Sequence, residues 1–367
     1  MDQVADAPSA NAAEGGRFEF TGTWTEFLPI ALTNFLLTIV TLGIYRFWAA
    51  ARERRYLWGR THFIDDALEW TGTGLEMFLG FVTVMVILVP ALLLANFAAQ
   101  GFLLRGEWAL AVLTLLVAYV GLFYLINVAQ FRALRYRLSR TYWHGIRGGS
   151  DDGGWDYGVS GTWKQALAIP TLGLVVPWTM TRLWNERWGR MSFGPYPFVA
   201  DAHSSGIYGR WLLIYGAVIV GFIVLVIAGV TGAVAGNAVG GEQGMAMGFG
   251  ATLIFALIFF YIGIPVLTLA YYAAFYRQVA SATSLGKLQF EFTARTKDWL
   301  ILFLTNIGLV IITLGVGLLF LSYRNWKFRV SHLVAHGTVD LDEVTQSATR
   351  APGEAEGLAD MFDMGAI

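Results

Sequence analysis

Two asparagines lie in strongly apolar surroundings at equivalent places of the 367-residue chain, Asn34 and Asn306. A buried polar side chain inside a membrane costs free energy unless it is hydrogen-bonded, and such residues often have a function. Together with Thr41 and Thr313, they would line a polar cavity that passes a small solute. The structural alternative is that each asparagine bonds to backbone carbonyls freed where its own helix breaks.

Arginines follow aromatic residues by four positions in three places: Trp48 and Arg52, Trp178 and Arg182, Phe320 and Arg324. Residues four apart share a helix face, so each pair would place a ring at the membrane interface and a guanidinium on a phosphate. This spacing predicts anionic membrane lipids as partners. The alternative is that the arginines cap helix C-termini or bond to neighbouring strands.

No catalytic constellation accompanies these residues. The chain has no cysteine, which excludes disulfides and thiolate metal ligands. We find no P-loop, nucleotide fingerprint, nucleophile elbow or paired carboxylates. His332 and His336 are four residues apart and would share a helix face, but no HExxH pattern surrounds them. We therefore expect no metal site, no cofactor, no nucleic-acid partner and no enzymatic activity.

The elements that carry these residues repeat along the chain. Residues 18–43 and 290–315 align without a gap and are identical at 13 of 26 positions, and a degenerate copy lies at 161–178. The period is too long for a solenoid of small units. The repeats extend over 18–74, 157–205 and 289–340. Each contains Thr-Leu-Gly, whose glycine is the expected helix break: Gly43, Gly173 and Gly315.

The composition is that of an integral membrane protein. The chain is 56% hydrophobic and only 14% charged, whereas charged residues make up about 25% of soluble domains. Glu76, at the start of the first long apolar stretch, is expected at the interface in a pair with an arginine. Four uncharged stretches are long enough to cross a bilayer as helices: Met77–Ala95, Trp108–Phe131, Trp211–Gly241 and Gly244–Tyr276.

Charge indicates whether the repeated segments also cross. If all of them crossed, lysines and arginines would be spread over both sides of the membrane. If only the four long stretches cross, every lysine and arginine except Arg105 lies on one side, which the positive-inside rule assigns to the cytoplasm. We therefore expect three non-spanning helical hairpins and both termini in the cytoplasm. The alternative is an ordinary cytoplasmic loop that follows a tilted spanning helix.

Short strands are expected beside the hairpins. Three segments alternate apolar and polar residues: 18–22, 68–72 and 290–293. Open strand edges are excluded from hydrocarbon, so these strands belong outside the membrane core. The predicted fold class is an all-α integral membrane protein with four spanning helices, three repeated non-spanning hairpins and short interfacial strands on the cytoplasmic face. Residues 17–344 would form a single membrane domain between two disordered tails, 1–16 and the acidic 345–367.

Glycines recur at every fourth position across the last two long stretches: Gly232, Gly236, Gly240, Gly244 and Gly248. Small residues at this spacing allow helices to approach closely. We expect tight packing of the two stretches against each other, with self-association into a homo-oligomer as the alternative.

Three segments resemble the YjgN-like family of bacterial inner-membrane proteins: Asn34–Trp48, Arg54–Leu57 and Leu68–Glu76. The resemblance extends over residues 18 to about 340. The family is of unknown function, so the resemblance implies a multi-pass protein of the bacterial inner membrane and supplies no catalytic residue. The middle copy lacks the asparagine, and the last copy lacks the Tyr-Arg-Phe-Trp run. A site that needs threefold equivalence is therefore not expected.

Two classes of function follow from these features. Repeats and broken apolar segments are typical of transporters and channels, which favours transport or permeation of a small solute. The alternative is a non-enzymatic scaffold or lipid-binding protein whose basic and aromatic hairpins hold anionic headgroups. The two classes differ in whether Asn34 and Asn306 line a polar cavity or lie in a solid apolar bundle.

Overall fold

The computed structural model describes residues 12–340, 345–347 and 349. Its contacts divide the chain into two compact units. The second unit comprises His203–Gln278 and Ala294–Thr305, and the first comprises the rest. Ala12–Glu14, within the segment expected to be a disordered tail, form strand β1, which pairs with β13 (Thr338–Asp340). The remainder of both expected tails lies largely outside the described residues.

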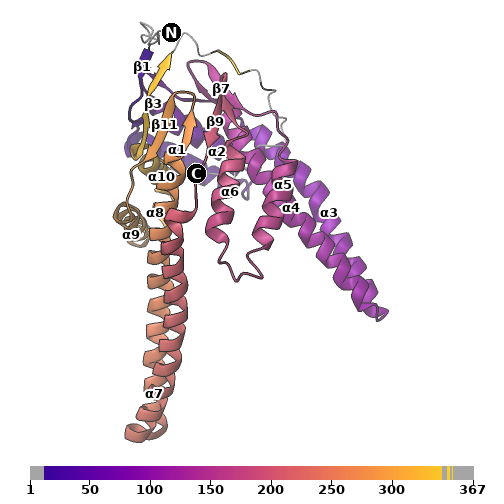
Figure 1. Ribbon diagram of the computed structural model, residues 1–367, viewed down its shortest axis with the longest axis vertical. Helices are drawn as coiled ribbons and strands as arrows, with labels where there is room; N and C mark the ends of the chain where they lie inside the picture. The colour runs from indigo at the N-terminus through magenta and orange to yellow at the C-terminus, as the bar shows by residue number, and fades with distance from the viewer. Residues whose placement is uncertain (1–11, 341–344, 348, 350–367) are drawn as a thin grey trace, which may run out of the picture. The chain divides into compact units, whose positions relative to one another are not determined.

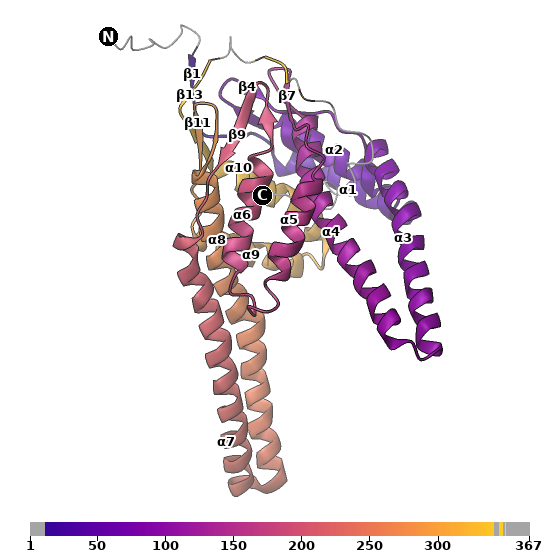
Figure 2. The ribbon, with the colours of Figure 1, turned by 45° about the vertical axis from the view of Figure 1, so that its right-hand side comes forward.

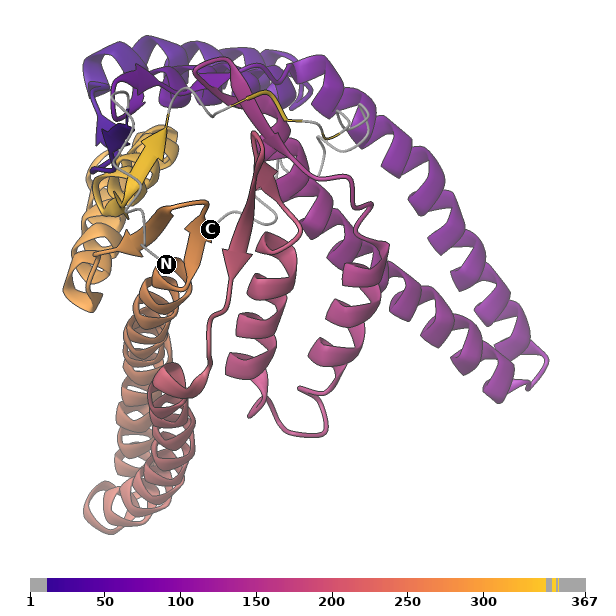
Figure 3. The ribbon, with the colours of Figure 1, turned by 45° about the horizontal axis from the view of Figure 1, so that its top comes forward.

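Helices come in antiparallel pairs along the chain (Figure 1). Two pairs of the first unit are short: α1 (Trp24–Val40) with α2 (Arg46–Gly59), and α5 (Trp155–Ala166) with α6 (Val176–Trp188). A third short pair joins α9 (Thr296–Ile312), through a 3-10 helix at Val316–Phe320, to α10 (Leu321–Ser331). Figure 3 shows α5 and α6 running side by side.

The long pairs contain the helices that are long and apolar enough to cross a membrane. Among the described residues there are three such helices: α3 (Gly74–Leu104), α4 (Trp108–Arg140) and the continuous run Ser205–Ser281. That run consists of α7 (Ser205–Ile258), a π-helix at Phe259–Gly263 and α8 (Ile264–Ser281). It reverses direction at Gly241, whose φ of 56° and ψ of −141° are not helical, so its two limbs lie side by side (Figures 1 and 2).

The two limbs of this run pack against each other through glycines, as the recurrence of glycine at every fourth position predicted. Gly236 faces Gly244, and Gly232 faces Gly248. A Cβ atom added at Gly236, Gly244 or Gly248 would clash with the backbone of the opposite glycine, and one added at Gly232 would make a tight contact at 3.2 Å. In a membrane, where helices gain little from burying apolar surface, this close approach supplies the van der Waals contact that holds them together. The expected tight packing of the two stretches is therefore confirmed.

The structure is mainly helical with short strands, as predicted, but the helical pairs support a sheet far more extensive than the all-α class implies. Eight strands form one antiparallel sheet in the order β12-β11-β10-β9-β8-β7-β6-β5. Each strand has two to five residues. The strands Glu19–Phe20, Glu69–Trp70 and Leu288–Phe292 fall in or overlap the three segments whose alternation predicted strands, whereas the other strands are too short to stand out in the sequence. The strands are β5 (Glu69–Trp70), β6 (Thr141–Trp143), β7 (Ile146–Gly149), β8 (Ser192–Phe193), β9 (Tyr196–Ala200), β10 (Thr283–Leu285), β11 (Leu288–Phe292) and β12 (Leu333–His336). A separate three-stranded sheet holds β2 (Glu19–Phe20), β3 (Thr61–Phe63) and β4 (Asp66–Ala67).

The strands come from hairpins that follow the second helix of each pair. Four hairpins have two-residue loops, as the pairing of the flanking residues shows: β3–β4, β6–β7, β8–β9 and β10–β11. The first loop residue has a positive φ in every case: Ile64, His144, Gly194 and Gly286. Two-residue loops of this handedness match the right-handed twist of the flanking strands. The same hairpin geometry therefore recurs after short and long helix pairs.

The three Thr-Leu-Gly segments form the same turn between the helices of the short pairs. The leucine and the glycine are both left-handed, with φ of 51° and 92° at Leu42 and Gly43, and closely similar values at residues 172–173 and 314–315. The threonine hydroxyl donates a hydrogen bond to the carbonyl four residues earlier, as Thr41 Oγ1 does to Leu37 O at 2.7 Å. The turn therefore ends the first helix and reverses the chain direction, so that the second helix runs antiparallel to the first.

An aromatic core lies where α1, α2 and α10 meet the bases of α3 and α4. Phe27 stacks on Tyr323 with ring centroids 5.4 Å apart, and Trp58 stacks on Trp326 at 4.1 Å. Glu76, at the start of α3, accepts hydrogen bonds from Arg140 at 2.9 Å and from the Tyr136 hydroxyl at 2.8 Å. The predicted pairing of Glu76 with an arginine is confirmed, and it ties the two ends of the α3–α4 pair together.

Candidate functional site

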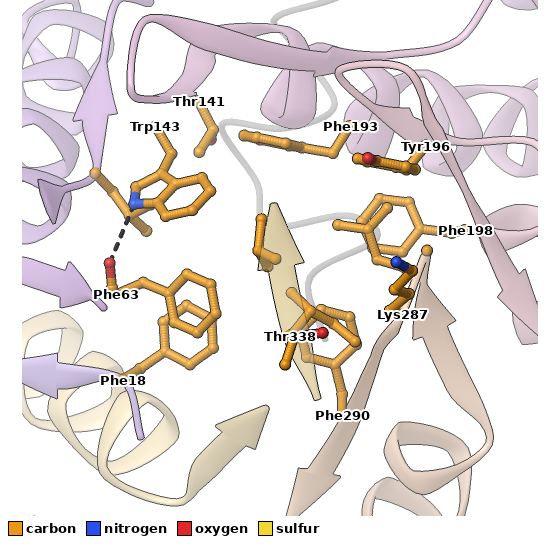
Figure 4. A pocket seen from close by; sticks show the side chains of 15 residues that line it. Phe18, Phe63, Thr141, Trp143, Phe193, Tyr196, Phe198, Lys287, Phe290 and Thr338 are labelled. Atoms are coloured by element: carbon orange, nitrogen blue, oxygen red, sulfur yellow. Dashed lines mark hydrogen bonds between the residues drawn. The ribbon is translucent and has the colours of Figure 1, made fainter. Parts of the chain in front are cut away.

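The hairpin tips of the first unit converge on one cavity. The residues just before the two-residue loops of the four hairpins are Phe63, Trp143, Phe193 and Leu285. All four line the cavity (Figure 4). Because side chains alternate between the two faces of a strand, the last residue before each loop occupies the same position relative to its turn. The recurring hairpin geometry thus builds a shared wall from four separate parts of the chain.

The cavity has a volume of about 230 Å³. Its remaining lining comes from neighbouring strands and loops and is also mostly apolar: Phe18, Leu68, Thr141, Tyr196, Phe198, Gly286, Lys287, Leu288, Phe290, Thr338 and Val339. Natural protein cores contain few voids larger than a water molecule. A hollow of this size in an aromatic core is therefore a candidate for occupation by a ligand.

Hydrogen bonding and stacking hold the aromatic wall in place. Phe18 and Phe63 stack with ring centroids 4.3 Å apart and an interplanar angle of 15°. The Trp143 indole Nε1–H donates a hydrogen bond to the Phe63 carbonyl oxygen at 3.1 Å, drawn as a dashed line in Figure 4. Thr141 Oγ1 bonds to Trp58 Nε1 and to the Arg137 carbonyl. The wall is therefore largely preformed, and the polar atoms of Trp143 and Thr141 have hydrogen-bond partners of their own.

One charge lies at the rim. Lys287 is the only lysine, arginine, histidine, aspartate or glutamate among the described residues that line the cavity. Its side chain is exposed, whereas Phe63, Trp143 and Leu288 are buried. As the second residue of the β10–β11 loop, it lies at a hairpin tip. The arrangement is an apolar interior with a cation at its edge, which is chemically suited to a molecule with an apolar body and an anionic group.

Hydrogen bonds link two hairpin tips next to the cavity. His144 Nε2 lies 2.9 Å from Asp65 Oδ1, and the His144 backbone N–H donates a hydrogen bond to Asp66 Oδ2 at 3.3 Å. The hydrogen bond from His144 lowers the pKa of Asp65 below its ordinary value. These contacts join the β3–β4 hairpin to the β6–β7 hairpin.

The predicted polar residues lie inside the short pairs and form what we call the polar links. Asn34 of α1 donates hydrogen bonds to the Ala49 carbonyl at 3.2 Å and to Glu53 at 3.4 Å, both on α2. Asn306 donates to Asn325 at 3.1 Å and accepts from Arg324 at 2.6 Å. Each asparagine thus bridges the two helices of its own pair, and neither lines the aromatic cavity.

The middle pair has a polar link that the sequence did not reveal. Lys164 precedes Thr171 by seven residues, just as Asn34 precedes Thr41. Lys164 is buried, forms an ion pair with Glu186 of α6, and donates a hydrogen bond to Ser160 at 2.6 Å. The middle copy therefore replaces the neutral link by a charged one. The equal distance to the Thr-Leu-Gly turn was the available signal.

Other predicted positions serve the turns and the packing. The hydroxyl groups of Thr41 and Thr313 bond to the backbone of their own turns. They accept hydrogen bonds from the Tyr45 and Gly317 N–H groups at 2.9 and 2.7 Å. Gly43, Gly173 and Gly315 lie at these turns with positive φ. The threonines thus satisfy the backbone of the helix break.

The three arginine and aromatic pairs have different surroundings. Arg52 and Arg182 are exposed, whereas Arg324 is half-buried and belongs to the polar link with Asn306. Trp48 packs on Phe78 at the start of α3, with ring centroids 5.6 Å apart. Trp178 packs on Trp163 of its own pair at 6.1 Å. Two of the three arginines are therefore accessible to a headgroup.

The two histidines do not share a helix face, contrary to the sequence-based expectation. His332 follows the last residue of α10 and contacts the Phe328 carbonyl at 2.8 Å. His336 lies in β12 and pairs with Glu291 of β11 at 2.9 Å. Helix α10 ends before His332, so the separation of four residues does not place the two histidines on one helix face.

Sequence reasoning missed the cavity altogether. Its signal was present as a short apolar and aromatic run before a Gly or Asp turn, repeated after each basic helix, as in His62–Asp66, Tyr142–Ile146 and Ser192–Tyr196. Each run is too brief to predict a strand alone. Their recurrence at corresponding places is what carries the information.

Comparisons with known proteins place the chain in a family. Residues 15–361 match the family model described as bacterial protein of unknown function (DUF898). The inner membrane protein YjgN of Salmonella typhimurium is 28% identical over 158 residues, which cover 42% of this chain and 35% of that protein. The YjgN protein of Escherichia coli O157:H7 is 26% identical over 155 residues, with the same coverage. The match thus spans about a third of each relative, and no solved structure matches. Because the family model covers nearly the whole sequence, the chain belongs to the DUF898 family of bacterial proteins of unknown function.

Proposed function

We propose that this protein is a multi-pass protein of the bacterial inner membrane that holds anionic lipid at the cytoplasmic face without catalysing a reaction. In this proposal α3, α4 and the two limbs of the Ser205–Ser281 run give four spans. Both termini and the eight-stranded sheet are cytoplasmic. The names of the two relatives support the inner membrane, and the placement of all basic residues except Arg105 on one side supports the orientation.

The observation that carries the proposal is the leucine at the tip of each short pair. Leu42, Leu172 and Leu314 are exposed by 94%, 77% and 94%, and all three have a positive φ near 50°. A left-handed turn favours glycine or asparagine, and water does not favour an exposed leucine. An apolar surrounding explains the residue type at all three tips. The short pairs would therefore dip into the cytoplasmic leaflet without crossing it.

Lipid headgroups then fall within reach of the second helices. Arg52 of α2 and Arg182 of α6 are exposed, and each follows the leucine at its tip by ten residues. A basic residue near an anionic leaflet contributes on the order of 1 kcal/mol of attraction. Arg324 is better explained as part of the polar link, since its Nε already donates to Asn306.

Transport of a polar solute is the second candidate, and it has less support. The groove between α3 and α4 is lined almost wholly by apolar side chains, such as Leu92, Leu113 and Leu122. The polar residues Asn34, Lys164 and Asn306 are engaged by partners within their own pairs. A water-filled path would need such groups turned towards a lumen.

Lipid analysis tests the proposal. The Arg52→Gln, Arg182→Gln double variant should co-purify with less phosphatidylglycerol and cardiolipin than the unchanged protein, as measured by mass spectrometry of extracted lipid. Arg105→Gln removes a charge from the opposite side and should leave the lipid content as it is. An unchanged anionic lipid content in the folded double variant would contradict the proposal.

Cysteine labelling tests the topology, because the chain contains no cysteine of its own. Single cysteines at residues 60, 190 and 330 should resist an impermeant thiol reagent applied from the periplasm, whereas those at residues 103 and 242 should react. A fluorophore at residue 42 or 172 should report an apolar environment, and one at Gly59 should report water. Labelling at 190 with protection at 60 would overturn the arrangement of the short pairs.

A further inference from the structure

We propose that the aromatic cavity at the hairpin tips is a binding site for a small amphiphilic carboxylate, with its apolar body inside and its carboxylate at Lys287. Nothing in this assignment depends on the lipid contacts proposed for Arg52 and Arg182, because the cavity belongs to the sheet. Its occupant would be a free carboxylate of modest size, either a medium-length acyl chain or a fused aromatic ring.

The way the cavity is built points to a ligand. Phe63, Trp143, Phe193 and Leu285 reach it from four hairpins that are widely separated in the sequence. Each hairpin follows a different helix pair. Bulky side chains delivered in this way could have filled the centre of the sheet, but they surround a hollow of about 230 Å³. The wall is rigid, since Phe18 stacks on Phe63 and Trp143 is bonded to the Phe63 carbonyl.

The volume sets the size of the apolar body. An apolar protein cavity of about 150 Å³ accommodates benzene. By proportion, about 230 Å³ accommodates roughly nine or ten carbon atoms. Drug-sized ligands need about 300–1,000 Å³ and do not fit without rearrangement. A whole phospholipid is therefore larger than the cavity, whereas a naphthalene ring or a ten-carbon chain matches its volume.

The single charge sets the polar group. Lys287 is exposed at the rim, and the other described lining residues carry no charge. Its carbonyl oxygen lies close to Gly337, in the segment before β13. A carboxylate bound there would remain partly hydrated, so its ion pair with Lys287 would add modest affinity and would weaken with salt. Apolar burial would supply most of the affinity and the ammonium would supply orientation.

Ligand binding to the full chain in nanodiscs provides the test. Saturation-transfer NMR would follow 2-naphthoate and decanoate, with empty nanodiscs of the same lipid to subtract partitioning into the bilayer. We expect at least one of the two to bind saturably, and comparison between them identifies whether an aromatic or an aliphatic body is preferred. Saturable binding of neither probe would overturn the proposal.

Three variants locate the binding. Leu285→Trp fills the cavity and should abolish saturable binding, with folding checked by circular dichroism and gel filtration. Lys287→Glu lies on an exposed loop and should weaken carboxylate binding about tenfold, with little change for uncharged 2-naphthalenemethanol. Lys327→Gln changes an exposed lysine outside the lining and should have no effect. Equal binding by the unchanged protein and by Lys287→Glu would remove the carboxylate from the assignment, and equal binding by a folded Leu285→Trp would remove the cavity.

The outcome is separable from the lipid proposal. Lys287→Glu should leave the co-purifying phosphatidylglycerol and cardiolipin unchanged, because Lys287 belongs to the sheet and not to a short pair. The Arg52→Gln, Arg182→Gln variant should in turn bind 2-naphthoate or decanoate normally. A variant that changed both readouts together would indicate a general folding defect.

Discussion

The short and the long helix pairs of this protein hold their two helices together by different means. Each short pair has a polar link at the same distance from its turn: Asn34 with Glu53, Lys164 with Glu186, and Asn306 with Arg324 and Asn325. The Ser205–Ser281 pair instead brings backbones together at Gly232, Gly236, Gly244 and Gly248. The α3–α4 pair leaves an apolar groove between its helices.

The difference shows how the free-energy cost of burying polar groups limits each type of contact. A polar link deep in hydrocarbon needs all its partners, since no water replaces a missing one. In the proposed topology, a short pair ends within one leaflet and its link would lie closer to the interface, which agrees with the partial exposure of Glu53 and Glu186. Long pairs rely on close packing of small residues, which involves no desolvation of charge. The four β-hairpins follow short and long helix pairs alike, so the two kinds of pair differ only in their helices.

The largest effect is expected from breaking the glycine contact of the long pair. Gly236→Leu would place a side chain against the Gly244 backbone, which cannot move aside within a helix. We expect a loss of about 3 kcal/mol of stability, or failure to fold, because overpacking against backbone is not relieved by rotamer changes. Thermal unfolding in detergent, followed by circular dichroism, measures it. The matched control is Gly250→Leu, where a Cβ atom meets nothing within 4 Å, and a loss of equal size there would undo the contrast between the pairs.

A smaller effect is expected from breaking the charged link of the middle short pair. Lys164→Met leaves Glu186 without its cation, and we expect the free energy of unfolding to fall by about 2 kcal/mol. That figure is below the range for fully buried pairs because the Glu186 side chain is 28% exposed and can regain water. The double variant Lys164→Met, Glu186→Leu should recover most of the loss. If the double variant were as unstable as the sum of its single changes, the link would not be a coupled pair.

The neutral link of the first pair should matter less. Asn34→Leu removes the hydrogen bonds to Ala49 and Glu53, but it also removes the buried Oδ1 atom, which has no partner among the described residues. We therefore expect a loss of about 1 kcal/mol in the same unfolding measurement. A loss larger than that of Lys164→Met would reverse the proposed order of charged and neutral links.

The turn of the short pairs offers a prediction of opposite sign at two glycines. Gly43→Ala places a Cβ atom on a residue with φ of 92° and should cost about 1 kcal/mol. Gly59→Ala, near the end of α2 in open space, should be neutral or stabilising by up to about 1 kcal/mol. Equal melting temperatures for the two variants would show that the Thr-Leu-Gly turn tolerates ordinary residues.

The smallest effect concerns the contact between a hairpin that follows a short pair and one that follows a long pair. The pKa of Asp65 is lowered from its ordinary value of 3.8 by the hydrogen bond from His144. A carboxyl group whose pKa is lower in the folded state stabilises the fold above its unfolded pKa, and this contribution disappears as the pH falls through the folded pKa. Stability should therefore decrease slightly below about pH 4. Asp65→Asn should remove that part of the pH dependence, and an identical pH profile in the variant would exclude the contribution.

Sequence patterns predicted the helical part of the fold well where the pattern was long. The long uncharged stretches, the helix breaks at Gly43, Gly173 and Gly315, and the close packing of the glycine stretches all follow from many residues acting together. Three of the strands were predicted, but the extent of the sheet was not, because its strands have two to five residues each and depend on pairing with strands far away in the chain. His332 and His336 show the converse error, since a helical spacing was assumed across a helix end.

By itself the sequence determined that the chain has long apolar helices and three similar broken segments, because hydropathy and glycine placement act locally along the chain. Tertiary structure alone decided that Lys164 takes the place of Asn34, that Arg324 is a structural partner of Asn306, and that four hairpin tips surround one cavity. Contacts between residues tens to hundreds of positions apart leave no periodic trace in a single sequence. Phe63, Trp143, Phe193 and Leu285 become neighbours only when the hairpins that carry them are brought together in the folded chain.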